Sequence, residues 1–484
     1  MISIALSHAS LVLGGRSIFQ DLTWEIQDRQ KIGLIGPNGA GKTSLFKIIT
    51  GEYVHEPGGN IVFAKGIFTG YLPQQPELDP GLTAYEAALQ GNPRYGELLE
   101  EFENIEERLG DPAVYNNPSL LSRTIDRQQT LLDEYAGLGG DSYPGRVLEI
   151  LSGLGLDVED FDQPIGAMSG GQKKLIGLAR LILLRPPVLL LDEPDNHLDL
   201  AGKCYLERLI QEYEGTIVIV SHDRYLLDAV VTHIAELEDG KLKVFEGDYS
   251  GYVIDKQERL ARQEELFRVQ QRSIARLEVS IKRLMYWAKQ FDNEKFAVRA
   301  RSMQNRLDKM DRIERPMLER RRMGFEINGW RGSNKVLELK GISKSFPTQN
   351  GNLEVLTDID LLIRHGERVG LIGANGAGKS VLLRLILGSE EPTSGSVTVG
   401  PSVKLGYYAQ EHETLDFNQT LINTVRYAGE MSESRAVAFL LRYLFTYNQS
   451  LQKIGELSGG ERSRLQLALL VLSGANFLLL DEPT

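Results

Sequence analysis

Apolar side chains between residues 256 and 322 recur with the period of paired helices. Leu260, Phe267, Ile274 and Ile281 follow one another at steps of seven residues. Leu277 and Leu284 lie three residues after Ile274 and Ile281. The pattern is repeated downstream by Met303, Leu307, Met310 and Ile313. Such spacing keeps one face of a helix against a partner helix. The sequence therefore predicts two long helices that fold back on each other, with their turn near residues 288–296.

A second pair of helices is predicted further towards the N-terminus. The stretches ELLEEFENIEERL (97–109) and LLSRTIDRQQTLLDEYAGL (120–138) both carry apolar residues at helical spacing. They are separated by DPAVYNNP, whose proline, aspartate and asparagine residues are typical of a turn. A helical hairpin at about 93–140 follows from this pattern.

Short apolar runs elsewhere predict buried strands. The clearest are VLLL at 188–191 and FLLL at 477–480, and MISIALSHASLVLGG at the start is predicted to be a first strand rather than a signal peptide. These runs are far shorter than the eighteen or so apolar residues that cross a bilayer. We therefore expect a protein that is not itself membrane-spanning.

The chain contains a tandem duplication with a period of about 337 residues. KIGLIGPNGAGKTSL at 31–45 returns as RVGLIGANGAGKSVL at 368–382. Three further pairs follow in the same order: GYLPQQ (70–75) with GYYAQE (406–411), MSGGQ (168–172) with LSGGE (457–461), and LLLDEP (189–194) with LLLDEP (478–483). A repeat this long indicates two domains rather than a solenoid.

The two copies differ in length in two places. Between the glutamine and SGG elements the first copy has about 47 more residues, which correspond to the helical hairpin at 93–140. The second copy stops directly after LLLDEP, so these 484 residues lack some 55 to 60 residues of its counterpart, and we expect an incomplete second site in a fragment. The predicted architecture is α/β: domain 1–250, a helical-hairpin linker 251–325, and an incomplete domain 326–484.

Charge sets the linker apart from the domains. The chain of 484 residues has a net charge of −12, which argues against a surface that binds nucleic acid as a whole. Residues 256–322, however, contain 19 Lys and Arg against 10 Asp and Glu. The single cysteine, Cys204, cannot form an internal disulfide, which fits a reducing, cytoplasmic location.

Two glycine loops carry the clearest chemistry. GPNGAGKT and GANGAGKS fit the pattern G-x-x-x-x-G-K-[ST], and each lies between a predicted apolar strand and an amphipathic helix. Backbone N–H groups of such a loop surround phosphate oxygens, the lysine reaches the outer phosphates, and the hydroxyl holds Mg²⁺. The predicted ATP-binding residues are Gly36, Pro37, Asn38, Gly39, Ala40, Gly41, Lys42 and Thr43, and Gly373, Ala374, Asn375, Gly376, Ala377, Gly378, Lys379 and Ser380.

Acidic pairs follow both apolar LLL strands. Asp192 and Asp481 end these strands, where a carboxylate can serve the metal through water. Glu193 and Glu482 come next and are the candidate general bases for the attacking water. The alternative is an ordinary acidic strand terminus at the surface.

One histidine, His222 in TIVIVSHDR, also follows a predicted strand. A neutral imidazole there could contact the terminal phosphate, although a single histidine more often has a structural role.

The order of glycine loop, glutamine loop, SGGQ or SGGE, and LLLDEP resembles ATP-binding cassette ATPases. In that family two cassettes face each other, and each nucleotide lies between the glycine loop of one and the SGG signature of the other. The resemblance implies a first site of Gly36–Thr43, Gln74, Asp192, Glu193 and His222 with Ser458, Gly459, Gly460 and Glu461. It implies a second of Gly373–Ser380, Gln410, Asp481 and Glu482 with Ser169, Gly170, Gly171 and Gln172. Mg²⁺ would be held by Thr43, Asp192 and Gln74, and by Ser380, Asp481 and Gln410.

Within the superfamily the chain is similar to the ABC-F group, which has tandem cassettes, no membrane span and a long charged hairpin between them. NHLD after the first DEP-x, GDYSGYVIDKQER and RARSMQNRLDKM carry this likeness. It implies binding at the ribosomal tRNA exit site, with the linker reaching peptidyl-tRNA and the peptidyl-transferase centre of 23S rRNA. General translation, stalled-ribosome rescue and antibiotic resistance all remain open. The expected RNA-contacting residues at the linker tip are Lys289, Lys295, Arg299 and Arg301.

Two departures from the group pattern are present. Asp195 stands where Thr is usual, as at Thr484, and Asp caps a helix equally well. Where an adenine-stacking aromatic is usual, the first copy has Val12 and Leu13 and the second has Phe346, so base selectivity at the first site is open.

Three alternatives remain at this point. The chain could be the ATPase subunit of a transporter, although tandem forms of those generally lack a basic hairpin of about 67 residues. It could be a DNA-repair or chromosome-associated cassette ATPase whose coiled coil contacts DNA. The hairpin could also be a solvated spacer without a nucleic-acid partner.

Overall fold

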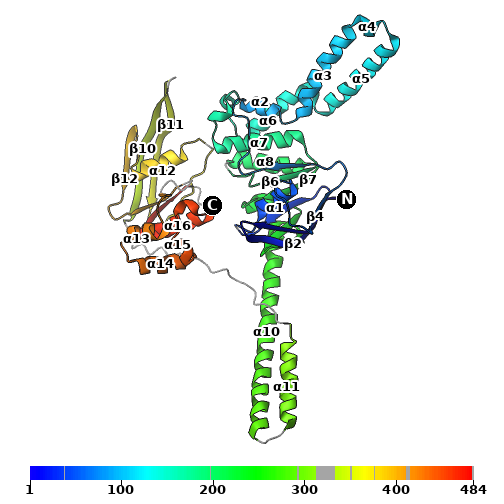
Figure 1. The fold of residues 1–484 in the computed structure, drawn as a ribbon. Helices are drawn as coiled ribbons and strands as arrows, with labels where there is room; N and C mark the ends of the chain where they lie inside the picture. The colour runs from blue at the N-terminus through cyan, green and yellow to red at the C-terminus, as the bar shows by residue number, and fades with distance from the viewer. Residues whose placement is uncertain are drawn as a thin grey trace. The chain divides into compact units, whose positions relative to one another are not determined.

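The structure, a computed structural model, describes residues 1–37, 39–196, 198–290, 294–311, 333–348, 351–374, 376–409 and 415–481. The chain divides into two compact units, 1–65 with 216–320 and 66–215 with 321–484. The predicted first domain, 1–250, therefore contributes to both units. Figure 1 shows the strands and helices of both copies.

An antiparallel sheet opens the first unit. Its order is β2-β1-β4, with β1 at Ile2–Leu13, β2 at Arg16–Gln27 and β4 at Asn60–Phe63. Alternate residues of the paired strands face the core, which buries Ile4, Leu6, Trp24 and Ile26. The β1–β2 turn is Gly14-Gly15, at φ 56° and 77°, values that glycine adopts without a steric penalty.

A parallel sheet carries the first glycine loop. β3 (Lys31–Ile35) lies between β7 (Thr216–Val220) and β8 (His233–Glu238), and β9 (Lys241–Glu246) pairs antiparallel with β8. Every residue of β7 is buried, as expected of a parallel strand covered on both faces. Helix α1 (Lys42–Ile49) follows β3, and α9 (Arg224–Val230) follows β7.

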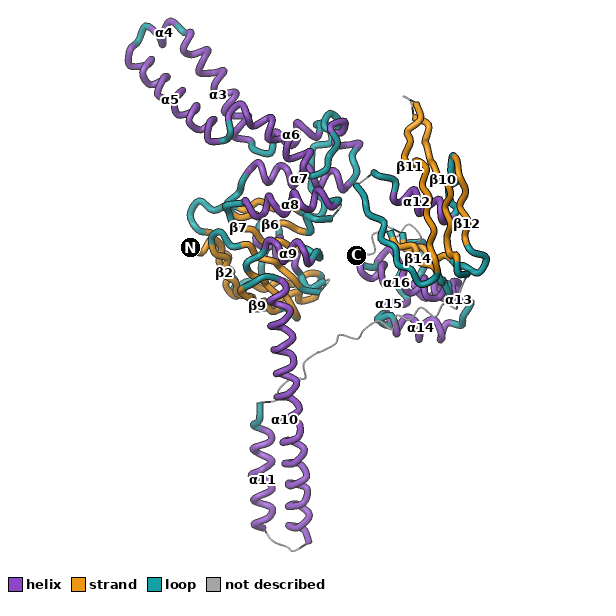
Figure 2. The backbone as a smooth tube through the Cα atoms, turned by 180° about the vertical axis from the view of Figure 1, so that it is seen from behind, coloured by secondary structure: helices purple, strands orange, loops and turns teal. Residues whose placement is uncertain are grey.

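The linker is a long antiparallel helical hairpin, as the heptad pattern predicts. Helix α10 (Tyr249–Gln290) has 42 residues and α11 (Glu294–Asp308) has 15, and both views show them side by side (Figures 1 and 2). Ile274, Ile281 and Leu307 form their buried seam, with Leu277, Met303 and Met310 packed against it. At 1.5 Å per residue α10 is about 63 Å long. Ile313 lies outside the described residues.

Residues 66–215 form the first-copy part of the second unit. Strand β5 (Thr69–Leu72) pairs in parallel with β6 (Val188–Asp192). The surrounding helices are α2 (Ala84–Leu89), α6 (Tyr143–Gly153), α7 (Gly170–Leu184) and α8 (Leu200–Glu212), with short 3₁₀ turns at Gly140–Ser142, Val158–Asp160 and Ile165–Ala167. Among the described residues, no helix combines the length and apolarity that a bilayer crossing needs.

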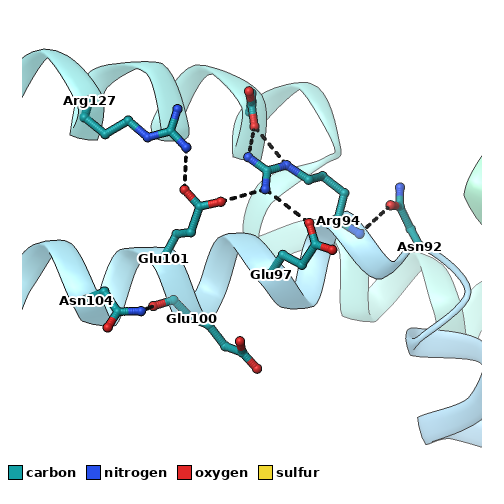
Figure 3. Close-up of polar contacts among 8 residues, drawn as sticks. Asn92, Arg94, Glu97, Glu100, Glu101, Asn104 and Arg127 are labelled. Atoms are coloured by element: carbon teal, nitrogen blue, oxygen red, sulfur yellow. Dashed lines mark hydrogen bonds and ion pairs between the residues drawn. The ribbon is translucent and has the colours of Figure 1, made fainter.

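The insert projects from these residues as a second helical hairpin. α3 (Pro93–Gly110) and α5 (Pro118–Gly137) are joined by the short α4 (Pro112–Tyr115) and pack through Leu98, Ile105 and Leu131. Figure 3 shows the ion pairs at its base. Arg94 contacts Glu134 at 2.6 Å and Glu101 at 2.7 Å, and Arg127 contacts Glu101 at 2.5 Å.

The second copy repeats the antiparallel sheet and the helical region. Its sheet order is β11-β10-β12, with β10 at Lys335–Thr348, β11 at Gly351–Arg364 and β12 at Ser394–Val399, and α12 (Lys379–Leu387) packs in the same core. β13 (Leu405–Tyr408) pairs in parallel with β14 (Phe477–Leu480). The remaining helices are α13 (Leu421–Gly429), α14 (Glu433–Arg442), α15 (Tyr447–Ser450), the 3₁₀ turn Ile454–Glu456 and α16 (Gly459–Leu472).

The strand predicted before the second glycine loop is not formed. Residues 365–374 are turn or coil, and Leu371 and Ile372 are 47% and 88% exposed, whereas Ile32 and Leu34 in β3 are almost fully buried. In the first copy the partners of β3 are β7 and β8. Among the described residues, no sheet includes the apolar run 368–372.

Candidate nucleotide sites

The first glycine loop has the backbone of a phosphate-binding turn. Gly36, Gly39 and Gly41 have φ values of 158°, 79° and 99°. A Cβ atom at Gly36 would lie 2.3 Å from the carbonyl oxygen of Leu237, and one at Gly41 would lie 2.5 Å from the Ile18 side chain. Only glycine therefore allows the loop to lie this close to β8 and β2.

Lys42 crosses this loop from the first turn of α1. Its ammonium donates hydrogen bonds to the carbonyl oxygens of Gly36 (2.9 Å) and Pro37 (3.3 Å). Lys379 does the same in the second copy, to Gly373 at 2.9 Å and Ala374 at 2.7 Å. Both ammonium groups thus contact the backbone of their own glycine loop.

Two cavities of the first unit flank this loop. The larger, about 690 Å³, is lined by residues 17–21, Pro37, Gly39, Ala40 and residues 239–241. Its volume lies in the range of small-ligand pockets. Among the described residues of this lining Phe19 is the only aromatic one, and it is 1% exposed. Val12 and Leu13 are exposed and lie outside the lining. An adenine base would thus meet no exposed aromatic ring on these walls.

The smaller cavity brings Lys42 and His222 together. It measures about 230 Å³ and its wall also contains Ser221, Arg224, Tyr249 and Tyr252. The loop that carries His222 is ordered by its neighbours: the backbone N–H of Asp223 donates to Ser221 Oγ at 2.9 Å. The Asp223 carboxylate in turn accepts from the backbone N–H groups of Tyr225 and Leu226 and caps α9. His222 therefore lines the same cavity as Lys42, on the side of the loop where the outer phosphate is expected.

Asp192 and Glu193 belong to the second unit. Asp192 ends the fully buried β6 and is 1% exposed. Glu193 has φ 53°, a left-handed conformation that costs a non-glycine residue on the order of 1 kcal/mol. Lys174 donates to its carbonyl oxygen at 2.7 Å, and Asn196 donates to its carboxylate at 2.8 Å. These two hydrogen bonds thus fix the orientation of Glu193, the candidate general base.

The sequence pattern does not single out Lys174 and Asn196 as site residues. Lys174 is 3% exposed, and burial lowers its pKa although Glu193, Asp192 and Asp195 act in the opposite direction. A lysine on an otherwise apolar helix face was the available signal. The equivalent position of the second copy is Ser463, so this cation is specific to the first copy.

Both SGG signatures begin helices in the same way. Ser169 caps α7, and its backbone N–H donates a hydrogen bond to the Gln172 side-chain oxygen at 3.1 Å. Ser458 and Glu461 form the equivalent capping box of α16, with the Ser458 N–H donating to the Glu461 carboxylate at 2.9 Å. The serines and following glycines are exposed or partly exposed. Helix N-termini with free backbone N–H groups are suited to phosphate oxygens.

Other predicted site residues are placed less completely. Gln74 is exposed just after β5, and Asp481 is 8% exposed and accepts a hydrogen bond from the Tyr407 hydroxyl at 3.4 Å. Lys42, Thr43 and His222 belong to the first unit, whereas Gln74, Asp192 and Glu193 belong to the second. Asn38, Asn375, Gln410 and Glu482 lie outside the described residues.

Comparisons with known proteins identify the family. A family model described as ABC transporter matches residues 19–196 and 356–484, and an extension model with the same description matches 235–327. The energy-dependent translational throttle protein EttA of Haemophilus influenzae is 35% identical over 97% of this chain and 82% of its own length. ABC transporter F family member 5 of Arabidopsis thaliana is 33% identical over 97% of this chain and 67% of its own. This chain belongs to the ABC-F group of ATP-binding cassette ATPases.

Two further comparisons are with another EttA relative and with a solved structure. EttA of Escherichia coli K12 is 34% identical over 97% of this chain and 82% of its own length. Among solved structures, an ATP-binding subunit of an ABC transporter covers 51% of this chain and 91% of its own, with 19% identity and a TM-score of 0.37. The resemblance to ABC-F proteins is confirmed, and the ABC-F chain is an ATPase.

The linker of this ABC-F protein has an ordered aromatic cluster beside its tip. Trp287 and Phe296 contact edge to face with ring centroids 5.9 Å apart, and the Arg283 guanidinium lies 5.1 Å from the Trp287 ring. Tyr286 is 64% exposed. The four predicted RNA-contacting residues are all exposed: Lys289, Lys295, Arg299 and Arg301.

Proposed function

We propose that this ABC-F ATPase binds the ribosome at the tRNA exit site and acts on peptidyl-tRNA and the peptidyl-transferase centre through α10 and α11. The role would belong to translation regulation, stalled-ribosome rescue or antibiotic resistance. The observation that carries the proposal is a long basic hairpin with exposed cations and an exposed tyrosine near its tip, on a chain with two nucleotide loops. The names of the EttA relatives, translational throttle proteins, support it.

The tip suits an RNA partner without sequence readout. Exposed Lys and Arg side chains neutralise phosphates, and an exposed Tyr286 ring offers a surface on which an unpaired base can stack. Arg283 and Phe296 pack against the neighbouring Trp287 ring in the two helices beside the tip. A protein that works in this way is expected in the cytoplasm.

For hydrolysis we propose the division of labour that the family pattern implies. Lys42 and Lys379 would bind the outer phosphates. Thr43, Gln74 and Asp192 in the first site, and Ser380, Gln410 and Asp481 in the second, would hold Mg²⁺, which would neutralise phosphate charge. Glu193 and Glu482 polarise the attacking water, and His222 contacts the terminal phosphate in the first site. The SGG serine and glycines of each copy would complete the site of the other, so that ATP favours a closed state and hydrolysis releases it.

Co-sedimentation tests the partner. A Glu193→Gln, Glu482→Gln variant is incubated with ribosomes, duplex DNA or membrane vesicles, with and without ATP. We expect ATP-dependent pelleting with ribosomes, and loss of it when the tip residues 283–301 are replaced by a glycine-serine linker.

A matched pair of variants distinguishes the effect of tip charge on ribosome binding from the effect of removing the tip residues. Lys289→Ala with Arg299→Ala should weaken ribosome pelleting and its salt dependence, whereas Lys65→Ala with Lys243→Ala, at exposed lysines outside the linker, should not. Pelleting with vesicles would favour a transporter subunit, and pelleting with DNA a repair-type ATPase. Ribosome pelleting that ignores both nucleotide and tip would contradict the proposal.

A further inference from the structure

The first turns of linker helix α10 form part of the wall of the cavity that contains Lys42 and His222. Tyr249 and Tyr252 line this cavity of about 230 Å³ together with Gly36 of the glycine loop. The Arg224 guanidinium, two residues after His222, lies 5.9 Å from the Tyr249 ring. The start of the linker and the phosphate-binding side of the first site therefore share one surface.

A pair of hydrogen bonds attaches α10 to the helix that follows the histidine loop. Asp228 of α9 accepts from the backbone N–H of Ser250 at 2.7 Å and from its hydroxyl at 2.5 Å. Asp223, next to His222, caps the other end of α9. Because α9 has only seven residues, a single short helix joins the histidine loop to the residue that binds Ser250.

A buried carboxylate attaches α10 to the strand beside the glycine loop. Glu236 is 6% exposed and accepts a hydrogen bond from the Tyr252 hydroxyl at 2.7 Å, and Lys256 contacts the same oxygen. Burial alone would raise the pKa of Glu236, but hydrogen bonds from Lys256 and Tyr252 outweigh it and lower the pKa. Glu236 lies opposite Ile35 in the β3–β8 pairing, and Ile35 directly precedes Gly36.

We propose that these two attachments couple the first nucleotide site to the linker. The phosphate contacts of Lys42 and His222 change the relative position of the glycine loop and the histidine loop, and each loop moves α10 through its own attachment. Tyr252, Ser250 and Arg224 are positioning residues in this scheme. By linkage, a partner that holds the hairpin changes the affinity of the first site for ATP. We expect the rate of ATP turnover to change with it, a consequence that rests on the proposed function.

The geometry of α10 amplifies small displacements. The attachments span residues 249–256, about 10 Å of helix, and the helix continues for some 50 Å to Gln290. A relative shift of about 1 Å between the two attachments becomes about 5 Å at the far end if the helix behaves as a rigid rod. A shift of this size is enough to change which RNA groups the tip contacts.

The coupling is tested first without ribosomes. Spin labels at Met285→Cys near the tip and Val62→Cys on β4, in a Cys204→Ser, Glu193→Gln background, report their distance by pulsed electron resonance. Both positions are about half exposed and belong to the first unit. We expect ATP to shift the distance by several ångströms, and Ser250→Ala with Tyr252→Phe to abolish at least half of the shift.

Matched controls lie on the same helix. Ser280→Ala removes a serine that bonds only within α10, and Tyr286→Phe removes an exposed hydroxyl, so both should keep the full shift. Asp228→Asn provides a third test that keeps the side-chain shape while it weakens the Ser250 contacts. Thermal unfolding identifies any variant that fails to fold.

The second measurement is the ATPase rate, with Glu193 intact, in the presence of ribosomes divided by the basal rate. Ser250→Ala should keep the basal rate and lower this ratio several-fold, while ribosome pelleting stays unchanged. No ATP-dependent shift in the parent, or a full shift in the double variant, would overturn the coupling. A shift that the double variant loses, in a protein that does not pellet with ribosomes, would support the coupling and contradict the proposed function.

Discussion

Substitutions at two glycines of the first loop distinguish the effect of steric crowding on ATP binding from the effect of backbone strain. Gly36 and Gly39 both have positive φ, but only a Cβ at Gly36 would collide, at 2.3 Å from the Leu237 carbonyl oxygen. We expect Gly36→Ala to lose ATP binding by at least tenfold, because the loop must move off β8. Gly39→Ala, which meets nothing within 4 Å, should lose less. Isothermal titration with ATP compares them, and equal losses would show that φ alone decides.

Lys174 gives a second prediction at the scale of single residues. It is the buried cation beside Asp192, Glu193 and Asp195. Lys174→Met should destabilise the protein by about 1 to 3 kcal/mol, because the Glu193 carbonyl oxygen loses its hydrogen bond from Lys174. Lys173→Met, on the less buried neighbour, should change the free energy of unfolding by no more than about 0.5 kcal/mol. Urea unfolding measures both, and equal effects would contradict the role of burial.

The lowered pKa of Lys174 also sets a pH dependence. The unfolded chain holds the proton more strongly than the folded protein does, so this residue makes stability rise with pH between the lowered pKa and the ordinary value of 10.5. Lys174→Met should flatten that part of the stability profile. If the stability of Lys174→Met varies with pH between pH 8 and 10.5 in the same way as that of the parent, the Lys174 ammonium must be solvated in the folded protein.

At the scale of elements, the linker depends on a narrow apolar seam. Ile281 is 5% exposed between α10 and α11, whereas Val279 on the same helix is 66% exposed. Ile281→Ala should destabilise the hairpin by about 2 kcal/mol and increase amide exchange in α11. Val279→Ala should leave exchange unchanged, and the reverse order would place the seam on the wrong face.

Heptad spacing, turn residues and apolar runs were sufficient to predict both hairpins and most strands, because each depends on local periodicity. The strand predicted at 368–372 is the exception. Its apolar pattern is as strong as that of β3, but a parallel strand is stable only between partners, and β7 and β8 supply them in the first copy. The local pattern therefore predicts which segment is able to form a strand, while the neighbouring strands decide whether it does.

At the scale of the whole molecule, the two nucleotide loops should differ in affinity. The loop of the first copy follows a paired strand and is flanked by two cavities, whereas residues 369–372 before the second loop are exposed. We expect Lys42→Ala to remove most ATP binding by these 484 residues, and Lys379→Ala to remove much less. Equilibrium dialysis with a slowly hydrolysed ATP analogue gives the stoichiometry of each variant. Equal losses would show that the second loop binds without its strand.

The sequence by itself determined the duplication, the family, the glycine loops, the signatures and the basic hairpin. These depend on residue type, spacing and charge, which are properties of short segments. Only the tertiary structure decided that Lys174 and Asn196 hold Glu193, that Glu236 anchors Tyr252 and Lys256, and that Tyr249 lines the same cavity as Lys42 and His222. Those contacts join residues from 3 to over 200 positions apart, and no periodicity records which buried polar groups meet once the strands and helices have packed.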